Sequence, residues 1–211
     1  MNKIIDRLYL GNLKGASDIN ALRSAGITHV LTVASGIEPF FPKEFKYKVI
    51  QVTDTSQSSL IRHFPAAISF MREGIAKGGV LVHCYAGVSR SASCVIAYLM
   101  QEKDMKFQEA FAFASKKRPV IFPNMGFQRQ LCEFEKLLHL KKSYSSPNRV
   151  DKVTAKFGGG IVGSVGGAKG AAAARIAGKQ DEEILKGFTR SMIRGPAPSN
   201  TIGIFNSSQG F

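Results

Sequence analysis

A cysteine and an arginine stand six positions apart in the segment VLVHCYAGVSRSA, at residues 80–92. Cys84 opens the interval, Gly87 lies within it and Arg90 closes it. The apolar run Val80–Val82 predicts a short buried strand before the interval, and the apolar residues after it predict a buried helix. A loop that joins a strand to a helix N-terminus turns backbone N–H groups into one concavity, where the helix dipole adds positive charge. The spacing therefore predicts an anion-binding loop with a thiol at its floor.

The chemistry that this loop can perform follows from its charged and nucleophilic groups. The planar guanidinium of Arg90 can hold two oxygens of a phosphate, and Gly87 permits a tight backbone path. The positive surroundings favour the thiolate form of Cys84, which is a nucleophile at neutral pH. The alternative is a buried structural thiol, since free cysteines are usually interior. The spacing of His83, Gly87, Arg90 and Ser91 favours a functional thiol, a nucleophile at the floor of an anion-binding pocket.

The elements that must position this loop alternate along the chain. Apolar runs of strand length occur at Ile4–Asp6, Leu8–Leu10, His29–Ala34, Tyr47–Val52 and Val80–Val82. Helical patterns cover Asp18–Ala25, His63–Lys77, Ser91–Gln101, Phe107–Ala114 and Phe127–Leu138. Such alternation predicts an α/β fold, with a central, mostly parallel (mixed) sheet of about five strands flanked by about six helices. Ligands of such sheets bind at the carboxyl ends of the strands.

The motif also carries a family resemblance. His-Cys-x5-Arg-Ser after a strand resembles the signature of the cysteine-dependent phosphatases, and HCYAGVSRSASCVIAYLM at 83–100 is similar to their dual-specificity branch. Similar stretches are LYLGN (8–12), ITHVLTV (27–33), the acidic segment at 54 with RHF (62–64), and PNMGFQRQLCEFEK (123–136). The resemblance is nearest to the small atypical members of the JNK-pathway-associated and VHY-like kind. It implies a catalytic domain over residues 1–142.

The resemblance implies a role for each residue of the loop. Cys84 attacks phosphorus and forms a phosphocysteine intermediate, and Ser91 assists departure of the thiolate in the second step. His83 orients the loop rather than transferring protons. The substrate phosphate binds to backbone amides and to one guanidinium, supplied by Tyr85, Ala86, Gly87, Val88, Ser89 and Arg90.

Two residues outside the loop complete the implied site. Asp54 matches the general acid, which protonates the leaving oxygen and then activates water. Its alternative interpretation is an ordinary turn residue, because aspartate before threonine is common in turns. Asn124 matches a supporting position behind the loop. Ser59 departs from the pattern, since many relatives have asparagine after the acid, and this weakens the family's support for the acid loop.

The implied function is that of a hydrolase of phosphoric monoesters. We expect a dual specificity protein phosphatase that dephosphorylates phosphotyrosine and phosphoserine or phosphothreonine in signalling proteins, with a kinase-pathway component as substrate by analogy. The variable loop positions contain no lysine, which relatives acting on inositol lipids often carry. Two alternatives remain: a phosphate-binding pseudophosphatase or scaffold, and a phosphatase that acts on a lipid or nucleic-acid phosphate.

Cysteine and histidine usage limits the cofactors and the setting. Three widely spread cysteines and the absence of a long apolar segment at the start predict a reducing, cytoplasmic setting, with the nucleus as an alternative. We expect no metal and no cofactor. Cys94 and Cys132 fall on predicted helices, where core packing is favoured over a protective disulfide between Cys84 and Cys94. The cations at 116–118 are interpreted as ordinary partners of a helix C-terminus.

Charge and composition divide the chain near residue 142. The net charge of +14 over 211 residues favours anionic partners such as a phosphoprotein, nucleic acid or acidic lipid. Residues 143–211 are rich in glycine, alanine and serine, and we expect a basic, disordered tail whose scattered charges give solubility rather than nucleic-acid binding. DEEILKGF at Asp181–Phe188 suits a short helix. No uncharged run of about 18 apolar residues exists, so no transmembrane segment is expected.

Overall fold

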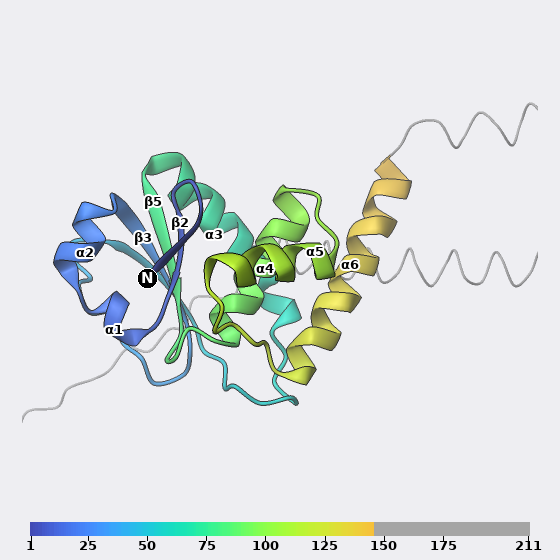
Figure 1. Cartoon of the computed structure of the whole chain (residues 1–211), viewed down its shortest axis with the longest axis horizontal. Coiled ribbons are helices and arrows are strands. Elements are labelled where there is room, and N and C mark those ends of the chain that lie inside the picture. The colour runs from blue at the N-terminus through green and yellow to red at the C-terminus, as the bar shows by residue number, and fades with distance from the viewer. Residues whose placement is uncertain (146–211) are drawn as a thin grey trace, which may run out of the picture.

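The computed structural model describes residues 1–145, and Figure 1 shows their arrangement. The strands are β1 (Asn2–Ile5), β2 (Leu8–Gly11), β3 (Ile27–Val33), β4 (Lys46–Ile50) and β5 (Gly79–His83). The helices are α1 (Leu13–Ala16), α2 (Ile19–Ser24), α3 (Phe64–Lys77), α4 (Arg90–Glu102), α5 (Phe107–Lys117) and α6 (Met125–Ser145), with a 3₁₀ turn at Ile61–His63. The predicted tail and its helix at Asp181–Phe188 lie outside the described residues.

The five strands form one sheet in the order β1-β2-β5-β3-β4. β1 pairs antiparallel with β2, and the other three pairs are parallel, so the predicted mostly parallel, mixed sheet is confirmed. β5 lies in the centre, where Gly11 of β2 and Thr32 of β3 both pair with His83. The carboxyl ends of these three strands therefore meet at one edge, and Cys84 follows directly from it.

The helices cover both faces of the sheet, as expected. Val80 and Val82 of β5 pack into the larger core with α3 to α6, whereas Leu81 between them packs with α1 and α2 on the opposite face. This alternation is the two-residue period of a strand that is buried on both sides. Figure 1 shows α1 and α2 on one side of the sheet and the four longer helices on the other. The sheet edge is therefore held rigidly from both faces.

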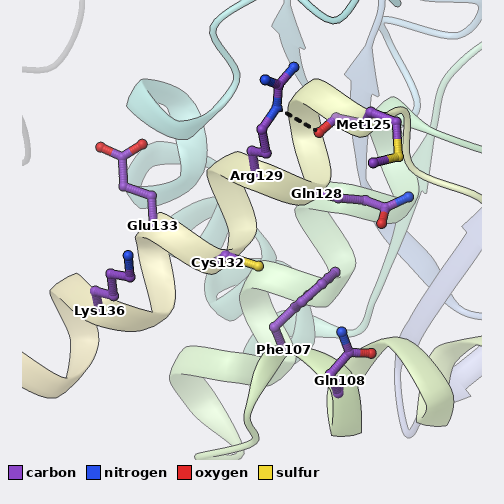
Figure 2. A pocket seen from close by; sticks show the side chains of 8 residues that line it. All are labelled: Phe107, Gln108, Met125, Gln128, Arg129, Cys132, Glu133 and Lys136. Atoms are coloured by element: carbon purple, nitrogen blue, oxygen red, sulfur yellow. Dashed lines mark hydrogen bonds between the residues drawn. The ribbon is translucent and has the colours of Figure 1, made fainter.

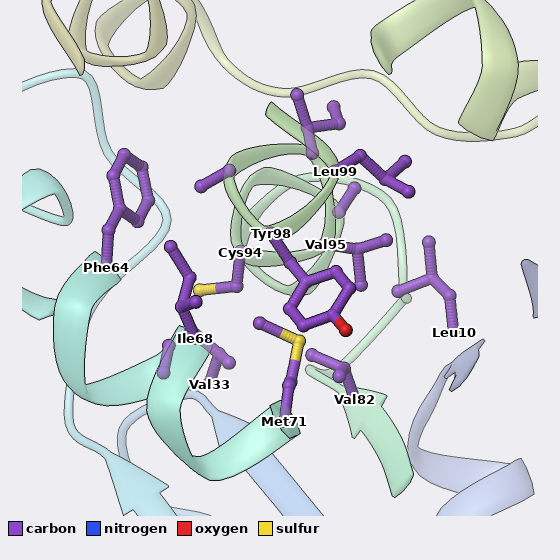
Figure 3. Packing of buried hydrophobic residues seen from close by; sticks show 14 of the residues in the cluster. Leu10, Val33, Phe64, Ile68, Met71, Val82, Cys94, Val95, Tyr98 and Leu99 are labelled. Carbon is purple, nitrogen blue, oxygen red and sulfur yellow. The ribbon is translucent and has the colours of Figure 1, made fainter. Parts of the chain in front are cut away.

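α4 is the central helix of the larger core. Every residue of Ser91–Met100 is buried, which matches the predicted buried helix. Figure 3 shows Ile68 and Met71 of α3 and Val82 of β5 around this helix. Burial of one such apolar side chain stabilises the folded state by about 1.5–3 kcal/mol. The many buried side chains of α4 together therefore fix the position of the helix. The same packing holds the N-terminus of α4, at which the loop at residues 84–90 ends.

The structure differs from the sequence-based expectation in short or terminal elements. α1 was not predicted, because a single turn capped by Asn12, whose side chain accepts from the Gly15 N–H at 3.0 Å, shows no helical periodicity. β4 ends at Ile50, two residues before the predicted end. α6 continues to Ser145, beyond the composition change at residue 142. No helix in the described part of the chain is long and apolar enough to cross a membrane.

Candidate active site

The loop between β5 and α4 turns its carbonyl oxygens outward. The Leu13 N–H donates to the Tyr85 carbonyl at 2.9 Å, and the Phe122 N–H donates to the Val88 carbonyl at 2.9 Å. All peptide bonds of the described residues are trans, so the N–H that follows each bound carbonyl points the opposite way. The loop amides are thereby directed into the concavity, where they can bind an anion.

Arg118 holds the middle of this loop from behind. Its Nε donates to the Gly87 carbonyl at 2.9 Å, its Nη2 to the Ala86 carbonyl at 3.2 Å, and its Nη1 to Asn2 Oδ1 at 2.7 Å. Burial lowers the pKa of this guanidinium, and the nearby Cys84 opposes that shift. The interpretation of this arginine as an ordinary helix-end cation is therefore wrong. The one sequence signal was the proline after it, which forces the preceding residue into extended backbone and away from the helix.

Gly87 occupies the point where the loop passes closest to β2. Its φ of +69° lies in the left-handed region, and a Cβ there would stand 2.3 Å from the Gly11 carbonyl oxygen and 2.9 Å from Arg118 Nη2. Its N–H donates to Cys84 Sγ at 3.3 Å. Both the backbone angle and the space therefore require glycine.

Cys84 lies at the floor of the loop, with only 1% of its surface exposed. Its sulfur accepts from the Gly87 N–H and, at 3.1 Å, from the hydroxyl of Ser91, which is fully buried. Two donors and the N-terminus of α4 all face the sulfur. This arrangement stabilises negative charge on it.

His83 is buried directly before the cysteine. Its Nδ1 lies 3.2 Å from the Cys84 carbonyl oxygen and its Nε2 lies 2.8 Å from Thr32 Oγ1. Because a carbonyl only accepts, Nδ1 carries the proton and Nε2 accepts from the Thr32 hydroxyl. Burial lowers the pKa of His83 to about 4, although the hydrogen bond to the carbonyl opposes the shift. The imidazole is thus neutral near pH 7 and fixes the junction between β5 and the loop. The contribution of Thr32 was not predicted from the sequence.

We expect the free energy of unfolding to fall as the pH drops from about 6.5 to about 4. In this range the unfolded chain protonates a histidine of pKa 6.5 whereas folded His83, of pKa about 4, stays neutral, so acid favours the unfolded state. The difference between the two pKa values corresponds to about 3 kcal/mol of the free energy of unfolding, and all of it is lost below pH 4. Urea unfolding at a series of pH values measures it. A His83→Gln variant should lose most of this dependence, and an unaltered dependence would contradict the assignment; burial lowers the pKa of His29 as well, which accounts for a remainder.

Asp54 reaches the loop from the segment after β4. Its Oδ1 accepts from Ser89 Oγ at 2.6 Å and from Asn124 Nδ2 at 2.8 Å, and its Oδ2 lies 3.4 Å from Arg90 Nε. The backbone N–H of Asn124 also donates to Ser89 Oγ at 3.1 Å. Thus the structure brings all four predicted residues together, and the carboxyl is oriented by two neutral donors and one cation.

Arg90 stands at the rim with 13% of its side chain exposed. Its Nη1 donates to the Val52 carbonyl at 3.3 Å. Its buried Nε has no hydrogen-bond partner among the described residues, although the Asp54 carboxylate lies within ion-pair distance. A buried, incompletely bonded guanidinium beside inward-facing amides is a site that an oxyanion would complete.

Comparison with known proteins decides the family. The model described as "Dual specificity phosphatase, catalytic domain" matches residues 8–137. The chain belongs to this family. Dual specificity protein phosphatase 1 of Arabidopsis thaliana is 43% identical over 140 residues, which are 66% of this chain and 71% of that protein. The MAP kinase phosphatase with leucine-rich repeats protein 2 of Dictyostelium discoideum is 47% identical over 133 residues, 63% of this chain and 19% of that protein.

A solved structure agrees with the phosphatase fold. The human tyrosine phosphatase-like serine/threonine/tyrosine-interacting protein superimposes with a TM-score of 0.63 at 38% identity, covering 65% of this chain and 96% of that one. The chain spans only about a fifth of the length of the Dictyostelium relative. The comparisons therefore show the phosphatase family and fold.

The segment that follows Asp54 in this phosphatase domain is supported from α6. Gln130 Oε1 accepts the backbone N–H groups of Leu60 at 2.7 Å and Ile61 at 2.8 Å, and its Nε2 donates to the Ser58 carbonyl at 2.8 Å. Sequence reasoning identified the departure at Ser59 but missed Gln130. A glutamine on a helix has no local signal that indicates a loop 70 residues earlier.

The other two cysteines of the phosphatase domain differ in their surroundings. Cys94 is buried in α4 as expected, and burial, with a smaller effect of Cys84, raises the pKa of its thiol. The expectation of core packing for Cys132 is wrong, because this residue is exposed on α6 while the stripe of Phe127, Leu131 and Phe134 beside it is buried. Within residues 1–145, no three histidine, cysteine or acidic side chains cluster in a way that could hold a metal ion.

Proposed function

We propose that the protein is a cysteine-dependent dual specificity phosphatase that hydrolyses phosphotyrosine and phosphoserine or phosphothreonine in proteins. The observation that carries the proposal is the convergence of three groups on one anion-binding loop. The Cys84 sulfur lies at its floor, the Arg90 guanidinium at its rim, and the Asp54 carboxyl lies 3.4 Å from that guanidinium. A nucleophile, a cation for the equatorial oxygens and an acid for the leaving oxygen are the parts that phosphoryl transfer requires.

In the first step of the proposed reaction, the phosphate oxygens accept hydrogen bonds from the loop amides and Arg90. The Cys84 thiolate attacks phosphorus in line, so a P–S bond forms while the bond to the leaving oxygen breaks. Asp54, in its protonated form, donates its proton to that oxygen. Ser89 and Asn124 hold the carboxyl in position for this transfer.

In the second step, water attacks the phosphocysteine. The Asp54 carboxylate accepts a proton from that water, which restores the acid for the next cycle. The P–S bond breaks, and the Ser91 hydroxyl, 3.1 Å from the sulfur, stabilises the departing thiolate. Neutral His83 keeps the loop in place without exchanging protons. Inorganic phosphate and the regenerated thiolate are the products.

The alternatives have less support from the site. A pseudophosphatase would not need the acid and the nucleophile that are both present here. Lipid substrates with several phosphates call for further cations, whereas the variable loop side chains are uncharged and one of them, Ser89, is bound to Asp54. The Dictyostelium relative is a MAP kinase phosphatase by name, which supports a kinase-pathway component as substrate. We also propose that the protein belongs to the JNK-pathway-associated or VHY-like subgroup. We further propose a cytoplasmic or nuclear setting, because a thiolate nucleophile needs a reducing environment.

The test of this function is trapping of the intermediate. The full chain should release phosphate from a small aryl phosphate and from phosphotyrosine, phosphoserine and phosphothreonine peptides. Rapid acid quenching should leave a phosphate adduct on the peptide that contains Cys84, detected by mass spectrometry. Tight binding of phosphopeptides without phosphate release or adduct would instead establish the pseudophosphatase. Faster turnover of phosphoinositides or RNA 5′-phosphates would favour the other alternative.

Arg118→Lys should lower kcat/KM for an aryl phosphate by about 30-fold, although the residue does not touch the phosphate. A lysine cannot donate to three acceptors in a fixed plane, so the loop carbonyls would no longer be held and the amides would lose their alignment. Steady-state kinetics measures the loss, and Lys116→Ala, an exposed neighbour, is the control. Unchanged kinetics in Arg118→Lys would show that the loop keeps its form without these bonds.

A further inference from the structure

A groove lies between α5 and α6 (Figure 2). It is open to solvent, has a volume of about 560 Å³, and its lining includes Phe107 of α5 and Met125, Arg129, Cys132 and Lys136 of α6. Figure 2 shows Phe107 and Cys132 on the facing sides of the groove. None of these residues takes part in the reaction described above, so the groove is separate from the chemistry.

One end of the groove is at Met125. This residue follows Asn124 directly in sequence, and Asn124 Nδ2 is 2.8 Å from Asp54 Oδ1. The other end is at Lys136, eleven positions further along α6, which is about 16 Å at the helical rise. An extended peptide covers that distance with about five residues. A polypeptide whose phosphate occupies the loop can therefore continue into the groove.

The groove leaves apolar surface open to water. Met125 is 61% exposed and Cys132 is also exposed, while Phe107, at 4% exposure, contributes a firm apolar wall. An apolar side chain that packs between these residues would be removed from water, which favours its binding. Arg129 and Lys136 outnumber the single acid of the lining, Glu133, so the polar edge carries a net positive charge.

We propose that this groove binds the substrate polypeptide and selects a bulky apolar residue about three to six positions from the phosphorylated side chain. The inference rests on the proposed function, because the same chain must place its phosphate in the loop. The apolar side chain packs between Phe107, Met125 and Cys132, and the cationic edge favours an acidic residue next to it. The groove thus adds a sequence preference at a distance from the phosphorylated residue, which the loop and its one large exposed side chain, Tyr85, do not reach.

The experiment uses the full chain and phosphotyrosine peptides of serine, glycine and alanine in which one leucine is moved through each position on both sides. We expect kcat/KM to rise about tenfold for leucine at one or two adjacent positions on one side only. Cys132→Arg fills the groove and should remove that preference. His139→Arg, which places the same side chain on the same helix beyond the lining residues, should retain it. Both variants should hydrolyse a small aryl phosphate within about twofold of the unmodified protein.

The groove proposal would be overturned if kcat/KM did not depend on the position of the leucine while turnover of the aryl phosphate was normal. It would also be overturned if the leucine preference persisted in Cys132→Arg.

Failure to hydrolyse any substrate, the aryl phosphate included, would contradict the proposed function instead. In that case the binding of the same peptides to the Cys84→Ser protein, measured by fluorescence anisotropy, still tests the groove. If the leucine peptides bind more tightly to Cys84→Ser and this difference is lost in the double variant Cys84→Ser/Cys132→Arg, the groove proposal is supported. If Cys84→Ser binds all the peptides with equal affinity, the proposal is overturned. Vesicle binding that Cys132→Arg abolishes, with a flat peptide profile, would assign the surface to a membrane and overturn the proposal.

Discussion

Cys84→Ser will lower kcat for an aryl phosphate by roughly 10⁴-fold or more. A serine hydroxyl is a far weaker acid and nucleophile than a thiol, and among the described residues no base contacts position 84 to remove its proton. The sulfur's two donors, the Gly87 N–H and the Ser91 hydroxyl, stabilise an anion and do nothing for a neutral alcohol. Phosphate binding should survive, because the amides and Arg90 are unchanged.

Two measurements separate lost chemistry from lost structure in this variant. Its thermal unfolding should remain close to that of the unmodified protein, since one sulfur is exchanged for one oxygen at a fully buried position. Cys132→Ser, at an exposed cysteine outside the loop, is the matched control and should retain full activity on the aryl phosphate, which does not reach the groove. Turnover above about one per cent in Cys84→Ser would show that another group attacks phosphorus.

Arg90→Lys will lower kcat/KM by about 10³-fold, the second largest effect that we expect. The guanidinium of Arg90 bonds to the Val52 carbonyl and faces Asp54, so its fork is oriented before substrate binds. A lysine keeps the charge but offers one flexible point instead of two parallel donors. It also removes the guanidinium nitrogen Nε that lies 3.4 Å from Asp54 Oδ2, so the position of the carboxyl is less well defined.

The loss in Arg90→Lys should fall more on kcat than on KM, because charge spreads over the equatorial oxygens in the transition state. Arg62→Lys, at an exposed arginine after the acid loop, is a conservative control and should leave kcat unchanged. A rise in KM alone would show that Arg90 binds ground state and transition state equally, which is the role of a binding residue only.

The loop at residues 84–90 and its flanking elements could be predicted because the sequence patterns that indicate them are local. A short apolar strand, a glycine and a buried helix follow one another within about twenty residues, and the structure places all of them as expected. Asp54 and Asn124 are far from the loop in sequence, so their inclusion depended on resemblance. The structure brings both to Ser89, and their roles remain part of the proposed mechanism.

The residues that sequence reasoning missed all act through tertiary contacts. Arg118 binds a carbonyl 31 positions away, Thr32 binds a histidine 51 positions away, and Gln130 binds backbone 70 positions away. None of them has an unusual neighbour pattern except for the proline after Arg118. The exposure of Cys132 could not be predicted either. This residue borders an apolar stripe of the helix, and periodicity alone does not show whether a residue at the edge of such a stripe is buried.

The contact between Asn2 and Arg118 has a practical consequence for anyone who handles this molecule. Through one side chain, the first strand is tied to the loop at residues 84–90, so loss of the Asn2 amide would weaken turnover from a distance. A preparation in which this amide is altered would therefore have low activity although every proposed reacting group is intact.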